Sequence, residues 1–140
     1  MFRKILVPID LEHGEHVDDA LRLSAEIAAT HNADVHLLSI IEAAPVVVSQ
    51  HLPQGYEQLA AKAVEKDLAP LVAKMGAAPE RATVCVRFGG VYQEILAYAK
   101  KVGIDLIVIG SHKPNVGDYL LGSNASRIVR HADCSVFVVR

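Results

Sequence analysis

The sequence has no tryptophan, few aromatic residues and two cysteines, and each shortage excludes a class of protein. Aromatic residues make up 5% of the 140 residues, which argues against a platform that stacks nucleic-acid bases. Cys85 and Cys134 stand far apart among apolar residues. This spacing predicts buried free thiols in a reducing compartment. Neither cysteine has a basic neighbour in the sequence, so no redox function is expected of them.

The chain also lacks an excess of either charge and any long apolar run. Fourteen Lys and Arg residues stand against sixteen Asp and Glu residues, and no basic stripe indicates nucleic acid or a membrane surface as partner. No apolar stretch approaches the roughly 20 residues of a membrane-spanning helix, and Met1 leads into FRKILVPID without the pattern of a signal peptide. We therefore expect a cytoplasmic protein that forms one domain over residues 1–140.

Short apolar runs alternate with helical periods along the chain. Four runs are rich in β-branched residues and apolar on both faces, and a fifth alternates more; they cover residues 4–9, 33–40, 105–110, 135–140 and 82–88. The segments between them repeat apolar residues at i, i+3, i+4 and i+7, and Gly76 and Gly103 stand where helices are expected to end. The alternation predicts an α/β fold with a doubly wound parallel sheet. Residues 42–55 are interpreted as an irregular insertion within reach of a binding site.

In open α/β sheets, ligands bind beyond the carboxyl ends of the strands at the topological switch point. Three segments are expected to converge there, namely 8–10, 39–41, and Gly110 with the loop that leads to Ser123. Asp10 offers an acceptor for a ribose hydroxyl or a carboxylate for a metal. Gly110 allows a ribose to lie close to the chain.

The segment LLGSNAS at residues 120–126 allows two interpretations. Ser123 is either a simple helix cap, or Gly122 and the first helical turn bind an anion through backbone N–H groups, with hydroxyls of Ser123 and Ser126 as further donors. The chain has neither a Walker A motif nor G-x-G-x-x-G. Gly89 and Gly90 are interpreted as a tight turn or a helix N-cap.

Histidines and serines offer weaker candidates. His13 and His16, with Glu12 and Glu15, have a permissive metal-ligand spacing but no partner cluster, so a solvated loop is expected. His112 is either a phosphate donor or an exposed loop histidine. His131 is expected to face the C-terminal dipole of the last helix. The serines have no evident base to form a nucleophilic triad.

Three stretches resemble the universal stress protein family over essentially the whole chain. They are KILVPID, VRFGGVYQEILAYAKKVGIDLIVIGS and LLGSNASRIVRHADCSVFVVR. The resemblance implies a three-layer fold with five parallel strands in the order 3-2-1-4-5. The family's nucleotide-binding pattern is Gly-x2-Gly-x9-Gly-[Ser/Thr]. Gly110, Gly122 and Ser123 match it, whereas Lys113 replaces the second glycine and the loop is one residue short, as in the small enterobacterial subgroup lettered F and G.

The resemblance implies a regulatory protein that binds ATP, or AMP or ADP, with magnesium reached through Asp10. At most slow ATP hydrolysis or autophosphorylation is expected, and no catalytic residue is assigned. The expected binding residues are Pro8, Ile9, Asp10, Ile40, Ile41, Gly110, Ser111, His112, Lys113, Gly122, Ser123, Asn124, Ala125 and Ser126. One alternative is an interaction or scaffold protein of the same fold that binds no nucleotide. Another is an ATP-consuming enzyme of the related hydrolase-like folds, but their S-G-G-x-D-S loop after the first strand is absent here.

The C-terminal run predicts an assembly. In the implied strand order the last strand is an edge, and its unbroken apolar residues are Val136, Phe137, Val138 and Val139. A long apolar edge strand invites pairing with another chain, and two-fold dimers are the commonest oligomers. We therefore expect a homodimer through this strand, against the simpler interpretation that its side chains only face helices on both sides.

Overall fold

Five parallel strands form one sheet in the order β3-β2-β1-β4-β5. The structure is a computed structural model that describes residues 1–11, 17–110 and 122–140. The strands are β1 (Lys4–Pro8), β2 (Asp34–Ile41), β3 (Ala82–Phe88), β4 (Leu106–Gly110) and β5 (Ser135–Val139). Each falls within one residue of its predicted run, and the predicted fold class and strand order are confirmed.

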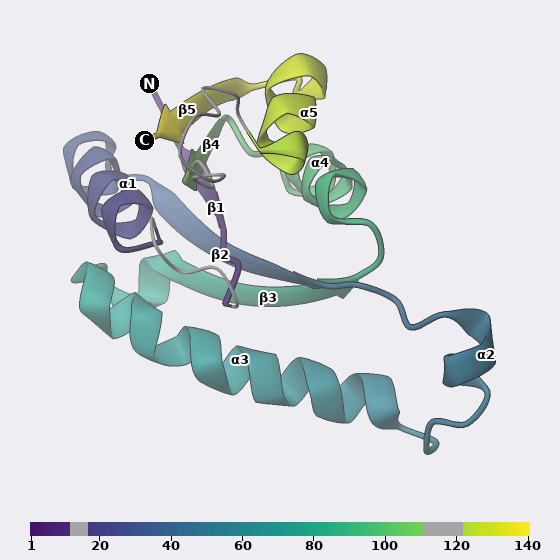
Figure 1. The fold of residues 1–140 in the computed structure, drawn as a ribbon. Coiled ribbons are helices and arrows are strands. Elements are labelled where there is room, and N and C mark those ends of the chain that lie inside the picture. The colour runs from purple at the N-terminus through teal and green to yellow at the C-terminus, as the bar shows by residue number, and fades with distance from the viewer. Residues whose placement is uncertain (12–16, 111–121) are drawn as a thin grey trace.

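Helices cover both faces of this sheet (Figure 1). Helices α1 (Val17–His31) and α3 (Tyr56–Met75) pack on one face, and α4 (Val91–Val102) and α5 (Ser123–His131) pack on the other. The described residues also form two short helical elements, α2 (Val46–Ser49) and the 3-10 turn η2 (Pro79–Arg81). The molecule therefore has two cores, one on each side of the sheet.

The central strands explain why the apolar runs were continuous rather than alternating. Ile5, Leu6 and Val7 of β1 are fully buried because successive side chains point to opposite faces and each face is covered by helices. On α1, Ser24 is buried with its hydroxyl donating to the carbonyl of Ala20 at 2.7 Å. This bond satisfies the one polar group of that helix that the core encloses.

Three glycine predictions at helix ends are confirmed. Gly76 and Gly103 follow α3 and α4 with φ of 70° and 76°, a left-handed conformation that glycine adopts without strain. Gly90 is the N-cap of α4, one of the two interpretations of the Gly89-Gly90 pair.

Two interpretations were wrong. Residues 42–55 are not wholly irregular, because Val46–Ser49 form α2 after Pro45, a residue whose fixed φ favours helix starts. The cysteines are free but half-buried rather than buried. Cys85 lies on β3 and Cys134 directly precedes β5, and both strands are sheet edges with less surrounding structure to cover their side chains.

Candidate functional site

The topological switch point of the sheet lies between β1 and β4, which are neighbours. After β1 the chain passes to α1 on one face, and after β4 it leads to α5 on the opposite face (Figure 1). The two carboxyl ends thus diverge. Beyond β1, the amide of Ile9 donates to the carbonyl of Leu38 at 2.8 Å, which extends the pairing with β2 to this edge. Such a divergence leaves a crevice at the carboxyl edge of the sheet.

A cavity of about 970 Å³ occupies this edge. Its wall comes from the carboxyl ends of β1, β2 and β4, from the start of α5, and from side chains of α1, α3 and α4. The structure brings ten of the predicted site residues to it, namely Pro8, Ile9, Asp10, Ile40, Ile41, Gly110, Gly122, Ser123, Asn124 and Ala125. Its size lies at the upper end of the range of small-molecule pockets, about 300–1,000 Å³.

The start of α5 differs from the simple capping interpretation by one residue. Gly122 is the N-cap, with φ −52° and ψ 152°, and no side chain caps the helix. Ser123 is the first helical residue, and the first backbone bond runs from the amide of Ser126 to the carbonyl of Gly122 at 2.9 Å. The backbone amides of residues 123–125 have no carbonyl acceptor within the helix, as in any α-helix. They belong to residues that line the cavity, where the helix dipole favours negative charge.

The rest of the wall divides into polar and apolar parts. Asp10 is exposed at the rim, and Ser39 is buried at the end of β2. The apolar part comes from the strands and their carboxyl ends, with Ile9, Leu38, Ile40, Ile41 and Ile109, and from α1, α3 and α4, with Val17, Ala20, Ala60, Ala63, Val64, Val91 and Ile95. The cavity therefore suits a ligand that joins an apolar ring to an anionic group.

Several predicted residues are not brought into this cavity. Ser126 is half-buried and does not line it. Ser111, His112 and Lys113, together with the rest of the loop to Leu121, lie outside the described residues. The weak metal candidates His13 and His16 also lie outside them. Within the described ranges, no group of three or more His, Cys, Asp or Glu side chains is arranged to hold a metal ion.

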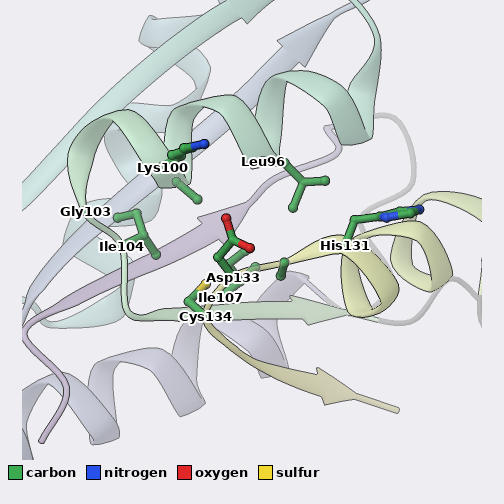
Figure 2. Close-up of a pocket in the computed structure, with 10 residues that line it drawn as sticks. Leu96, Lys100, Gly103, Ile104, Ile107, His131, Asp133 and Cys134 are labelled. Carbon is green, nitrogen blue, oxygen red and sulfur yellow. The ribbon is translucent and has the colours of Figure 1, made fainter.

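A second cavity, of about 240 Å³, lies between the C-terminal ends of α4 and α5 (Figure 2). Residues that precede β4 and β5 line it, so it lies at the amino edge of the sheet. None of the predicted binding residues is there. His131 is the last residue of α5, as predicted for a side chain near the helix dipole. Burial, followed by the Asp105 and Asp133 carboxylates, raises the pKa of the Cys134 thiol, which makes it a poor nucleophile.

Sequence reasoning missed one buried polar pair. Nδ1 of His36 on β2 lies 2.8 Å from the hydroxyl of Tyr98 on α4, and both residues are buried. Burial lowers the pKa of His36, the charge on Lys4 lowers it further, and Asp34 opposes them. Burial, followed by Cys85, raises the pKa of Tyr98. Burial therefore favours the neutral form of both side chains, which share one hydrogen bond. The position of His36 within an apolar run of β2 was the only available signal.

The fold and the cavity together define a class: an α/β protein with a 3-2-1-4-5 parallel sheet and a ligand-sized cavity at the switch point between its halves. The family model described as the universal stress protein family matches residues 1–140. The chain belongs to this family.

Relatives and solved structures agree with that assignment. Universal stress protein G of Shigella flexneri is 34% identical over 143 residues, which cover 100% of both chains. The structure of the universal stress protein UspA from Lactobacillus plantarum has a TM-score of 0.77 at 26% identity, covering 99% of this chain and 98% of that one. The universal stress protein from Archaeoglobus fulgidus in complex with dAMP has a TM-score of 0.69 at 21% identity, covering 99% and 98%.

Proposed function

We propose that this protein binds an adenine nucleotide in the cavity at the carboxyl edge of its sheet and acts as a regulatory protein. The observation that carries the proposal is that one cavity, formed by segments 8–10, 40–41, 110 and 122–125, combines the first turn of α5 with an apolar wall. The family supports it, since the Archaeoglobus fulgidus protein of the same fold is described in complex with dAMP.

Each part of the wall suits one part of the ligand. The amides at the start of α5 bind phosphate, aided by the helix dipole. Asp10 accepts a hydrogen bond from a ribose hydroxyl or reaches a magnesium ion that accompanies the phosphates. The apolar part of the wall holds the base. This arrangement serves AMP, ADP and ATP alike, and Ser111, His112 and Lys113 remain predicted contacts to the longer phosphate chain.

The same wall argues for little or no turnover. The carboxylates among its described residues are Asp10 and Glu42, both exposed. No histidine or cysteine is among the described residues that line it, so this part of the chain supplies no activated nucleophile. We expect any hydrolysis of ATP to run far below the range of ordinary enzymes, about 1–1,000 per second.

Calorimetric titration with AMP, ADP and ATP, each with and without magnesium, tests the proposal. Gly122→Val is the informative variant. The backbone angles at Gly122 (φ −52°, ψ 152°) are open to any residue, so the new side chain obstructs the cavity without straining the turn. Ser126→Ala is the control, because Ser126 belongs to the same turn but does not line the cavity. Unchanged affinity in a folded Gly122→Val protein would contradict the phosphate assignment.

A homodimer through β5 completes the proposal. Val136 and Val138 pack against the core on one face and Val139 against the core on the other, as the simpler interpretation has it, whereas Phe137 of the same strand is 46% exposed. Among the strands of the described residues, β5 pairs with β4 alone. Val138→Pro removes a backbone donor and should shift sedimentation of the dimer toward monomer. A wild-type protein that sediments as a monomer at micromolar concentration would refute the interface.

A further inference from the structure

Five of the nine exposed large apolar side chains among the described residues lie on α2 or in the first turn of α3, and the other four are Met1, Leu11, Val129 and Phe137. Val46, Val47 and Val48 of α2 are 73%, 72% and 48% exposed, and Leu59 near the start of α3 is 67% exposed. Single exposed apolar residues are ordinary, whereas a contiguous group marks a surface that contacts something. Figure 1 shows α2 beyond the ends of β2 and β3, apart from the other helices of the sheet.

Within the described part of the chain, few contacts hold helix α2 in place. None of its residues is buried, and it makes no extensive contact with any other described element. Its hydrogen bonds are local, such as those from the amides of Val48 and Ser49 to the carbonyl of Pro45. A segment with few buried contacts lies at the low-stability end of a structure and changes position readily.

Both connections of α2 lead directly to the candidate cavity. Ile41 and Glu42, which precede it, line the cavity, and so do Ala60 and Val64 after it. Four residues lie between Glu42 and Val47, and an extended chain spans about 3.3–3.6 Å per residue, so these five steps reach roughly 17 Å at most. On the other side, Gly55 has φ 83°, a conformation that permits a sharp turn before α3.

We propose that α2 is a ligand-contacting element that folds over the open side of this cavity and packs its valines on the apolar ring of the bound nucleotide. The inference rests on the proposed function and extends it, because it assigns the contact to residues outside the cavity wall. Residues 43–55 contain no Asp, Glu, Lys or Arg. The segment therefore suits the base of the nucleotide, while the phosphate lies at the start of α5.

Two other occupants fit the valines less well. Helices that lie on membranes carry Lys and Arg on their polar face, and residues 43–55 have neither. A second copy of the chain is proposed to pair with β5, whereas α2 is attached to β2 and α3, on the β3 side of the sheet. We therefore assign the valines of α2 to a nucleotide in the adjoining cavity.

The absence of tryptophan makes Val47→Trp a single fluorescent reporter. Saturating AMP or ATP should shift its emission to shorter wavelength as α2 closes. In a separate variant, Val47→Asp should weaken nucleotide binding about tenfold, chiefly through faster dissociation. Without ligand, Val47→Asp should have the same unfolding temperature as the wild type, because Val47 is exposed in this structure. Gln58→Asp is the control, since it adds the same charge at an exposed position of α3 that does not line the cavity.

The possible results separate this inference from the proposed function. A nucleotide-dependent emission shift, together with weaker binding only in Val47→Asp, supports the role of α2. Binding of normal affinity in Val47→Asp, or an emission unchanged at saturation, overturns it and leaves nucleotide binding intact. A wild-type protein that binds no adenine nucleotide overturns both. An emission shift that grows with protein concentration without nucleotide shows a contact between copies and also overturns the inference.

Discussion

Removal of one oxygen atom from Tyr98 is expected to destabilise the protein measurably. The hydroxyl lies 2.8 Å from Nδ1 of His36 in the core beneath α4. In Tyr98→Phe the two rings keep their edge-to-face contact, with centroids 5.8 Å apart in the wild type, so the change removes the hydrogen bonds of the hydroxyl, to His36 and to Cys85, and keeps the ring. Nδ1 loses this partner in a residue that is 9% exposed, and an orphaned buried polar group costs about 1–3 kcal/mol. This is a large share of a typical stability of about 5–15 kcal/mol.

Urea unfolding at pH 8 measures this loss, with an unchanged slope showing that the denatured state is unaffected. Tyr92→Phe is a matched control on the same helix. Its ring is half-buried and lies 5.0 Å from the Arg127 guanidinium, a contact that survives loss of the hydroxyl. The control should stay within about 0.5 kcal/mol of the wild type. Equal effects of the two substitutions, or a Tyr98→Phe protein as stable as the wild type, would refute the reasoning.

Two further predictions use the same assay. The pKa of His36 is lower in the folded protein than its ordinary value of 6.5. As the pH falls through 6.5, the unfolded chain therefore takes up a proton at this residue before the folded chain does. The contribution of His36 to the free energy of unfolding is therefore complete above that pH and declines as the pH falls below it. His36→Gln should weaken this decline. A urea midpoint of the wild type that rises on acidification would contradict the prediction. Leu68→Ala should cost about 2–5 kcal/mol, since Leu68 is fully buried, whereas Leu59→Ala should change stability by less than about 0.5 kcal/mol. Similar losses at both positions would show that the buried face of α3 is assigned wrongly.

The parts of the fold that the sequence predicted depend on neighbours close along the chain. The apolar run around Ile5–Val7 indicates a strand buried on both faces, and Gly103 indicates the end of α4, from local patterns alone. The strand order is different, because it joins residues far apart. It came from the family resemblance, and the pairing of β1 with both β2 and β4 confirms it.

Other features could not be read from local patterns. The hydrogen bond between His36 and Tyr98 joins residues 62 positions apart, and the sequence around one of them does not identify the other as its partner. At the start of α5, both Gly122 and Ser123 are good N-cap residues, and the choice of Gly122 depends on how the chain arrives at the helix. Helix α2 could not be predicted from periodicity, because it has four residues, none of them buried, and so shows no repeat of buried positions along the sequence.

The candidate site could be predicted in part from the sequence. Its location follows from the topology of the sheet, whereas its chemistry depends on particular residues. Any doubly wound sheet in which β1 and β4 are neighbours has a crevice at their carboxyl ends, so convergence of segments 8–10 and 122–125 there restates the fold. Convergence alone therefore does not single out a nucleotide. What narrows the ligand is the pairing of a helix start that has no side-chain cap with an apolar wall from α1 and α3. The first favours an anion and the second an apolar ring, and both line one cavity of about 970 Å³, so a ligand that carries both groups fits it better than a ligand that carries one.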